Sequence, residues 1–268
     1  MSLVPRLPAH AESTIQQFLR GHASGEGVEG VVIGLSGGID SALTARLARD
    51  ALGASAVLGV LLPDRSYPDP LRKETEGFAR DLGIETQTVP IETLETPFHS
   101  SFPEVSDRLT WGNVKARLRM IVLYTISRER RRRVVGTGNK SEILLGYFTK
   151  YGDGGADLIP IGDLYKTQVG ELAEALELPR VIRDRPPTAG LWEGQTDEAE
   201  LGLPYHDIDQ ILFGLEQLRT EEEIAKETKL PLDTVRGVAQ RVSTNRHKRR
   251  VAPIPKIGLR TVGIDWRD

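Results

Sequence analysis

The chain of 268 residues contains no cysteine and no long apolar run. The absence of cysteine excludes disulfides, thiolate zinc sites and any cysteine nucleophile. No hydrophobic stretch approaches the ~20 residues of a membrane span, and Pro5, Arg6 and His10 interrupt any signal-peptide core. We therefore expect a cytoplasmic protein that makes no use of a membrane.

The chain also lacks a strong charge of either sign. Its formal net charge is −3, with 39% hydrophobic and 27% charged residues, which is typical of a globular protein that buries a sizeable core. A weak net charge argues against a general nucleic-acid coat. Five arginines between Arg128 and Arg133 are best interpreted as a solvated helix end, with an RNA-binding patch as the minor alternative.

A glycine-rich turn stands between a predicted buried strand at Val31–Ile33 and a predicted helix from Ala42 to Asp50. The first N–H groups of such a helix lack intrahelical partners and carry partial positive charge, so they favour an anion. Glycines let the backbone approach a phosphate, and serines add hydroxyl donors. The turn therefore predicts a phosphate-binding site, made of Gly34, Leu35, Ser36, Gly37, Gly38, Ile39, Asp40 and Ser41.

Asp40 would repel a bound phosphate unless a divalent cation lay between them, so we interpret it as a magnesium ligand. Its alternative role is a simple helix cap together with Ser41. The turn is not a Walker A loop, because no lysine follows the glycines at the required place, and it lacks the dinucleotide fingerprint G-x-G-x-x-G.

Strands and helices alternate along the first 180 residues. This pattern predicts an α/β fold with a doubly wound parallel sheet of about five strands flanked by helices, followed by C-terminal helices. Ligands of such sheets bind at the carboxyl ends of the strands. The predicted strands are Val31–Ile33, Ala56–Leu62, Thr86–Ile91, a run at Val134–Val135 and a short run at Leu158–Ile161; the predicted helices include Pro8–Gly21, Pro70–Leu82, Gly112–Arg132, Tyr165–Leu178, His206–Leu218, Glu221–Lys229 and Leu232–Lys248.

Several residues fall at the predicted functional edge of the sheet. Thr137 follows the fourth strand, and Glu142, on the short helix after it, can supply a second carboxylate to magnesium. The alternative for Glu142 is a first-turn glutamate that the helix dipole favours. Lys166 starts a helix, where a cation opposes the helix dipole, so it needs an anionic partner. Arg65 follows the second strand and could contact an adenine, although an exposed loop arginine is the commoner case. The helix Gly112–Arg132 is expected to bury a stripe of Leu118, Ile121, Val122 and Thr125, with Asn113 and Arg117 together on another face.

Two stretches are predicted to form functional loops. Residues 148–157 hold three glycines, two acids and a lysine, which favours a binding loop. Residues 183–204 contain no predicted element, and more than about 15 such residues usually form a lid or a tether. We expect a lid whose closure keeps water from a reactive intermediate.

The turn resembles the SGGxDS loop of the ATP pyrophosphatases, and longer segments resemble the ammonia-dependent NAD synthetase family. These segments extend almost to the C-terminus and are more specific than the glycine turn. They are Ser36–Ser41, Asn113 with Arg117, Gly136–Glu142, Gly146–Gly155, Leu164–Thr167, Pro187–Ala189, Leu191–Glu198 and His247–Lys248. One departure is Arg65–Pro70, where bacterial members often have a segment rich in Gln and Asp; this leaves adenine recognition open.

The resemblance implies an adenine nucleotide alpha hydrolase-like fold and a single domain over residues 1–268. Its nucleotide-binding core would span about 26–182, the lid about 183–204 and a helical segment 205–268. It further implies a homodimer whose dinucleotide site lies at or near the subunit interface. The implied roles are ATP binding by Gly34–Ser41, Thr137, Lys166 and Thr188, magnesium binding by Asp40 and Glu142, and deamido-NAD binding by Asn113, Arg117, Lys150, Asp157, His247 and Lys248.

The family's reaction joins ammonia to deamido-NAD with cleavage of ATP to AMP and pyrophosphate, through an acyl-adenylate. It is the last step of NAD biosynthesis. Lys166 would neutralise charge on the phosphates, and Asp153, in the glycine-rich loop, is our candidate for the base that takes a proton from ammonium. The alternatives are another ATP pyrophosphatase, such as a tRNA-thiolating enzyme, disfavoured by the missing cysteines, and a nucleotide- or RNA-binding module without catalysis.

Overall fold

The structure is a computed structural model that describes residues 3–262 apart from 24, 26 and 193. A four-stranded, fully parallel sheet with the order β3-β2-β1-β4 lies at its centre. The strands are β1 (Val31–Gly34), β2 (Val57–Leu61), β3 (Glu85–Thr88) and β4 (Arg133–Val135). The chain moves outward from β1 to one side and then returns to place β4 on the other. The strand order therefore reverses beside β1, and ligands of open α/β sheets bind at this switch point.

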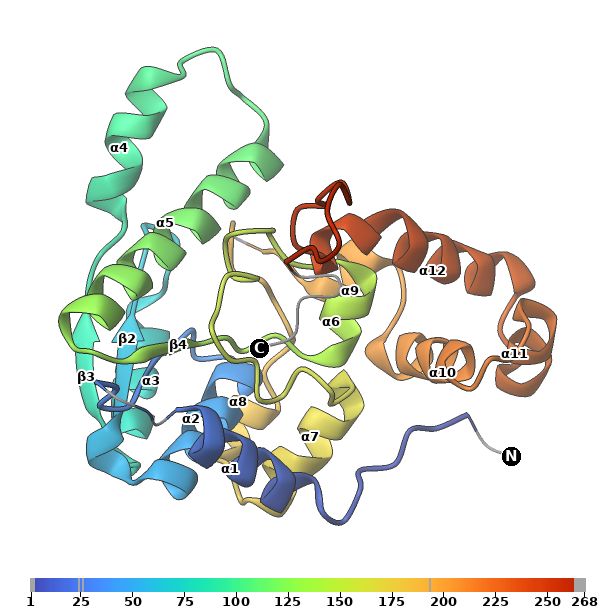
Figure 1. Cartoon of the computed structure of the whole chain (residues 1–268), viewed down its shortest axis with the longest axis horizontal. Helices are drawn as coiled ribbons and strands as arrows, with labels where there is room; N and C mark the ends of the chain where they lie inside the picture. The colour runs from blue at the N-terminus through green and yellow to red at the C-terminus, as the bar shows by residue number, and fades with distance from the viewer. Residues whose placement is uncertain (1–2, 24, 26, 193, 263–268) are drawn as a thin grey trace.

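The helices fill the connections between strands and continue after the sheet is complete (Figure 1). They are α1 (Ala11–His22), α2 (Ile39–Leu52), α3 (Asp69–Asp81), α4 (Glu92–Ser101), α5 (Arg108–Glu129), α6 (Lys140–Leu145), α7 (Lys166–Ala175), α8 (Arg180–Arg183), α9 (Asp197–Leu201), α10 (Tyr205–Glu216), α11 (Glu221–Thr228) and α12 (Leu232–Thr244), with 3₁₀ turns η1 (Ala54–Ala56) and η2 (Asn245–Arg249). Among the described residues, no helix has both the length and the apolar character needed to cross a membrane.

Alternate residues of the strands face opposite layers, as the period of two requires. Val31 and Ile33 join the core formed with α1, α2, α3 and α7, whereas Val32 joins the core formed with α5. Helices therefore cover both faces of the sheet, and the predicted doubly wound architecture is confirmed. A third cluster packs α6 against α10, α11 and α12, beside the sheet (Figure 1).

The predicted count of about five strands is too high. Leu158 pairs with Val135 through a single parallel bridge, and within the described part of the chain no strand continues from it. Pro160, two residues later, has no N–H with which to extend a ladder. The expected fifth strand is thus reduced to one bridge at the edge of β4.

Three further predictions were wrong in detail. Ile121 is 51% exposed, because the stripe that α5 buries runs through Leu118, Val122 and Ile126, which follow one another at intervals of four residues. Residues 183–204 are not free of regular structure, since they contain the short helix α9. The predicted last helix ends earlier, at Thr244, and continues as η2.

Candidate active site

The glycine turn links the buried end of β1 to the first turn of α2. Gly37 adopts a φ of +79°, and a Cβ at this position would approach side-chain atoms of Leu71 and Thr75 to 2.6 Å. Both constraints require glycine. The turn therefore runs close to α3, and the first N–H groups of α2, which have no acceptor within their own helix, can bind an anion.

The two serines of the turn also shape it from within. Ser41 donates its hydroxyl to the Gly38 carbonyl at 3.0 Å, and the Gly38 N–H donates to Ser36 Oγ at 3.2 Å. The two hydroxyl oxygens lie 3.1 Å apart. In this state the serines hold the conformation of the turn, and their expected contacts to phosphate stay a prediction.

Three charged side chains meet beside the turn. Lys166 Nζ pairs with Asp40 Oδ2. Asn139, which is fully buried, donates its side-chain N–H to Asp40 Oδ1 at 2.9 Å and its backbone N–H to Glu142 Oε2 at 3.1 Å. One asparagine thus links both predicted metal ligands. The clearest sequence signal for it is a capping box, with Asn three residues before Glu.

The charged side chains in this cluster change one another's pKa. Burial, together with the nearby Asp40 carboxylate, raises the pKa of Glu142 to about 8. Burial alone would lower the pKa of Lys166, but the carboxylates of Asp40 and Glu142 outweigh that effect and raise it. Lys166 therefore stays protonated at neutral pH. A positive charge beside the two carboxylates stabilises their ionised forms.

This donor set fits magnesium. Two neighbouring carboxylates match the one or two that Mg²⁺ takes from proteins, with the remaining positions left to phosphate oxygens and water. Within the part of the chain that the structure describes, no group of three or more His, Asp or Glu side chains is arranged to hold a metal by itself. Magnesium would therefore bind here together with a nucleotide.

Lys166 owes its position to a buried aspartate that sequence reasoning missed. Asp209 of α10 is fully buried and accepts the Thr167 N–H and the Thr167 hydroxyl, each at 2.8 Å. It also accepts the Ser141 hydroxyl, whose oxygen in turn accepts the Lys166 N–H at 2.9 Å. Burial raises the pKa of Asp209, and these hydrogen bonds oppose the rise. Nothing in the sequence around Asp209 indicates that it caps α7.

The predicted lid packs against the body of the protein. Asp197 of α9 is 3% exposed and accepts the Tyr205 hydroxyl at 3.2 Å on one oxygen, while its other oxygen has no hydrogen-bond partner among the residues that the structure describes. Lys115 Nζ donates to the Leu191 carbonyl at 3.2 Å. Thr188 is exposed, and its hydroxyl oxygen accepts the Gly190 N–H, so its expected contact to ATP stays a prediction. Glu193 lies outside the described residues.

Most of the residues expected to bind a dinucleotide, Asp157 excepted, gather around the loop after α6. Thr149 donates to Asn113 Oδ1 at 2.7 Å, and Arg117 donates to the Lys150 carbonyl at 3.3 Å. The Thr149 N–H donates to Asp153 Oδ1 at 2.9 Å, which orients that carboxylate. The structure therefore joins α5 to the predicted binding loop.

The C-terminal basic residues reach the same loop. Lys150 Nζ donates to the carbonyls of His247 and Arg250 at 2.7 and 2.9 Å. Lys248 Nζ donates to the carbonyls of Gly146 and Phe148 at 2.7 and 2.9 Å. Segments about a hundred residues apart in the sequence thus form one basic region.

Two other predicted residues make contacts away from that region. Asp157 accepts the Val134 N–H at 2.8 Å and the Tyr124 hydroxyl at 3.0 Å, so it holds the edge of β4. Arg65, whose side chain is 77% exposed, pairs with Glu92 at 2.7 Å. Thr137 follows β4 on the side of the glycine turn, as expected from a parallel sheet.

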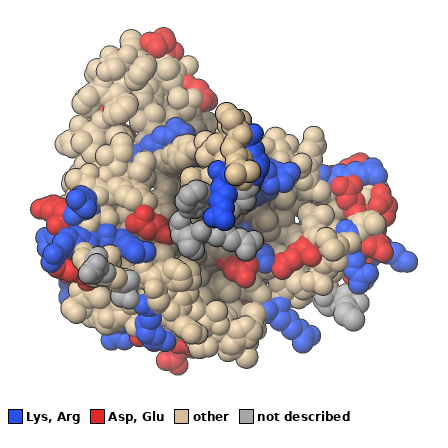
Figure 2. Space-filling model, viewed as in Figure 1, with Lys and Arg blue, Asp and Glu red and all other residues tan. Residues whose placement is uncertain are grey.

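The arginine cluster at the end of α5 lies where β4 begins, at the amino ends of the strands, whereas the glycine turn lies at their carboxyl ends. Arg131 pairs with Glu29, Arg130 lies 3.8 Å from Glu85, and Arg132 donates to the Ser55 carbonyl at 3.1 Å. Figure 2 shows acidic and basic side chains interspersed on the face that it draws. These pairings favour a structural role for the cluster over an RNA-binding one.

Comparison with known proteins shows similarity over most of the length of the chain. The family model described as NAD synthase matches residues 12–252. The NH(3)-dependent NAD(+) synthetase of Methanosarcina acetivorans is 47% identical over 92% of this chain and 98% of its own length. The protein of the same description from Methanocaldococcus jannaschii is 42% identical over 91% of this chain and 95% of its own.

Solved structures of similar proteins also superpose on most of the chain. An NMN synthetase from Francisella tularensis superposes with a TM-score of 0.79 at 34% identity, covering 94% of this chain and 100% of its own. An NH3-dependent NAD synthetase from Campylobacter jejuni, in complex with the nitrate ion, superposes with a TM-score of 0.76 at 29% identity, covering 92% and 97%.

Proposed function

The chain belongs to the NAD synthase family, and we propose how its residues carry out the reaction. The protein is an ammonia-dependent ligase that converts deamido-NAD to NAD with ATP as co-substrate, the last step of NAD biosynthesis. The observation that carries the residue assignment is the cluster of Asp40, Glu142 and Lys166 beside the glycine turn. A phosphate-binding turn, two carboxylates and a fixed cation are what nucleotide phosphates require.

The proposed chemistry proceeds in two steps. An oxygen of the nicotinate carboxylate attacks the α-phosphorus of ATP, the bond to the β-phosphate breaks, and an acyl-adenylate and pyrophosphate form. Ammonia then attacks the acyl carbon, the bond to AMP breaks, and a proton leaves the nitrogen. The amides of Gly34–Ser41 would receive the pyrophosphate, and Lys166 would neutralise charge on the phosphates.

We assign the magnesium site to Asp40 and Glu142. Asn139 donates a hydrogen bond to each carboxylate. Burial and Asp40 raise the pKa of Glu142 to about 8, which indicates that a further cation would stabilise its ionised form. When bound, magnesium supplies charge neutralisation to the phosphates.

We assign the general base to Asp153. Its carboxylate is oriented by the Thr149 N–H and lies in the loop that Asn113 and Arg117 contact. Asp153→Asn should lower turnover by about 10²–10⁴, the range attributed to a positioned base. The deficit should shrink as pH and free ammonia rise; unchanged turnover would remove Asp153 from the chemistry.

The deamido-NAD site would be formed by Asn113, Arg117, Lys150, Asp157, His247 and Lys248. Support comes from the basic region around the loop after α6, which contains the side chains of Lys150 and Lys248. Both ammonium groups are held by backbone carbonyls, which a substrate phosphate could replace. Of these residues, Asp157 has the weakest support because it already holds β4.

We propose a homodimer that uses the arm formed by α4 and α5. Phe98, Phe102, Leu109 and Ile121 are 41%, 48%, 58% and 51% exposed. The arm shows few charged side chains on the face drawn in Figure 2, and exposed apolar surface of this kind marks interfaces. Ile121→Asp should yield monomers in analytical ultracentrifugation. The matched control is Leu218→Asp, at a 91% exposed leucine after α10, which should leave the oligomeric state unchanged.

The segment 183–204 would act as a lid over the adenylate. Its anchors are the buried Asp197 and the contact from Lys115 to Leu191. Protease cleavage between Leu191 and Gly202 should slow when ATP and deamido-NAD are both bound. If both substrates leave the cleavage rate unchanged, this segment is not a lid.

The decisive assay supplies ATP, deamido-NAD, ammonium and Mg²⁺ and measures NAD, AMP and pyrophosphate together. Equal amounts of the three products are expected. The similarity to the Francisella NMN synthetase makes nicotinate mononucleotide the essential competing substrate; preference for the mononucleotide would change the assigned substrate. Steeply salt-dependent RNA binding without product formation would favour the noncatalytic alternative.

A further inference from the structure

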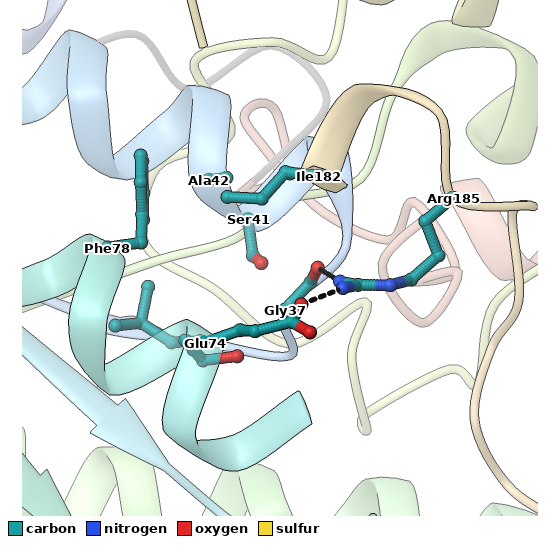
Figure 3. Close-up of a pocket in the computed structure, with 9 residues that line it drawn as sticks. Gly37, Ser41, Ala42, Glu74, Phe78, Ile182 and Arg185 are labelled. Atoms are coloured by element: carbon teal, nitrogen blue, oxygen red, sulfur yellow. Dashed lines mark hydrogen bonds and ion pairs between the residues drawn. The ribbon is translucent and has the colours of Figure 1, made fainter. Parts of the chain in front are cut away.

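Arg185 joins the glycine turn to the helix on its other side. Its guanidinium donates to the Gly37 carbonyl through one nitrogen and to the Glu74 carboxylate through another (Figure 3). Glu74 lies on α3, and Arg185 follows α8, about 150 residues after the turn. Arg185 lies outside the glycine motif, yet it contacts the motif's backbone directly.

The backbone presents this arginine in a defined position. Ile182, on the helix just before it, is 4% exposed and packs in the core against α2. Pro186 and Pro187 follow, and a residue before proline is restricted to extended conformations. The side chain of Arg185 is 23% exposed. The helix before it is anchored in the core and the dipeptide after it is rigid, and together they keep Arg185 next to the turn.

The contact decides the orientation of one peptide group. In a planar trans peptide the carbonyl of Gly37 and the N–H of Gly38 point in opposite directions. Arg185 holds the carbonyl, and Ser36 Oγ accepts the N–H at 3.2 Å, so the peptide is held from both sides. Glycine on both sides of the bond makes rotation of this peptide plane easy, because neither residue restricts φ. A rotated peptide would turn a carbonyl oxygen toward the place where an anion binds.

We propose that Arg185 is a positioning residue for the phosphate-binding turn: it keeps the Gly37–Gly38 peptide from presenting its oxygen to the triphosphate and to the departing pyrophosphate. Glu74 orients the guanidinium for this task. The inference rests on the proposed role of the glycine turn in binding ATP phosphates. A planar guanidinium can bridge a carbonyl and a carboxylate at once, whereas an ammonium offers a point charge.

The test is the binding of inorganic pyrophosphate with Mg²⁺ to the full chain by calorimetry, and the KM values for ATP and deamido-NAD. Arg185→Ala should weaken pyrophosphate binding and raise the KM for ATP by about 10-fold or more, as expected for loss of a charged hydrogen bond. The KM for deamido-NAD should change less than twofold. Arg185→Lys should restore only part of the loss.

Arg183→Ala is the matched control. Arg183 also bridges a carbonyl, that of Leu178 at 2.9 Å, and a carboxylate, that of Glu174 at 3.1 Å, but it lies away from the turn. This variant should bind pyrophosphate like the wild type. Both variants are compared by their melting temperatures. If Arg185→Ala does not fold, Glu74→Gln replaces it, and a loss of about threefold in pyrophosphate affinity is expected.

Three results would overturn the inference. Pyrophosphate affinity and KM for ATP within twofold of wild type in a folded Arg185→Ala protein would show that the contact has no role. Full rescue by lysine would assign the effect to charge alone. Absence of pyrophosphate binding in the wild type would remove the proposed phosphate site itself, so this failure is distinguishable from the first two.

Discussion

Replacement of Asp209 by alanine tests how Lys166 is held in place. Asp209 is fully buried and accepts three hydrogen bonds, from the Thr167 N–H, the Thr167 hydroxyl and the Ser141 hydroxyl. Its loss leaves the Thr167 N–H at the start of α7 without an acceptor. A lost helix cap costs about 1–2 kcal/mol, and each buried donor without a partner costs about 1–3 kcal/mol.

Two effects reduce the sum. The hydroxyls of Ser141 and Thr167 can rotate toward other acceptors, and removal of a buried carboxylate recovers part of its desolvation cost. We therefore expect Asp209→Ala to lower the free energy of unfolding by about 2–4 kcal/mol. For a chain of this size the melting temperature should fall by about 5–12 °C. Ser141 also accepts the Lys166 N–H, so kcat should fall by about 10-fold or more through misplacement of the ammonium.

Thermal unfolding followed by circular dichroism, together with steady-state kinetics, measures both effects. Asp207→Ala is the control, because Asp207 belongs to the same helix and has an intermediate exposure; its melting temperature should stay within about 2 °C of the wild type. Asp209→Asn should fall between the two, since its amide keeps one acceptor and replaces the other by a donor. A drop of less than about 2 °C in Asp209→Ala, with unchanged kcat, would refute the reasoning.

Three other substitutions test the site. Lys166→Ala should lower kcat by about 10²–10³, measured by AMP release, because a fixed cation beside the phosphates is lost; equal turnover would contradict its role. Gly37→Ala should destabilise the fold by about 1–3 kcal/mol and weaken ATP binding in a titration, since a Cβ at φ +79° would clash with Leu71 and Thr75. Glu142 has its pKa raised to about 8 by burial and by Asp40, so the folded protein keeps this proton to higher pH than the unfolded chain. In EDTA, stability should therefore fall as pH rises from about 4.5 to about 8, and Glu142→Gln should remove that fall in a series of melting curves. Mg²⁺ with ATP should stabilise the wild type more at pH 8 than at pH 6, and no difference would argue against Glu142 as a ligand.

Local pattern was sufficient for the four parallel strands and the glycine turn, but it also predicted a fifth strand that is only one bridge. The apolar runs at Val31–Ile33 and Val57–Leu61 are buried on both faces, so their composition alone marks them as central strands. The α5 stripe was harder to predict. Ile121 is as apolar as Val122, and only the packing direction of the helix decides which one is buried.

The residues that hold the site in place were beyond prediction. Asn139 could be suspected as a cap, but its contact to Asp40 joins α6 to α2 across 99 positions of sequence. Asp209 and Arg185 belong to segments that carry no motif for phosphate or metal. Their contacts arise because α10 and α8 pack where the chain brings them, and no periodicity encodes that.

Residue order is enough to predict the parallel α/β arrangement, the position of the glycine turn and the charged residues next to it, because these follow from local spacing, apolar pattern and backbone freedom. Which side chains meet is visible only in the folded protein. It joined Lys166 to Asp40, Asp209 to the start of α7, and Arg185 to the Gly37 carbonyl. The physical reason is that contacts between distant segments depend on how whole helices pack on the sheet, which is a property of the complete core.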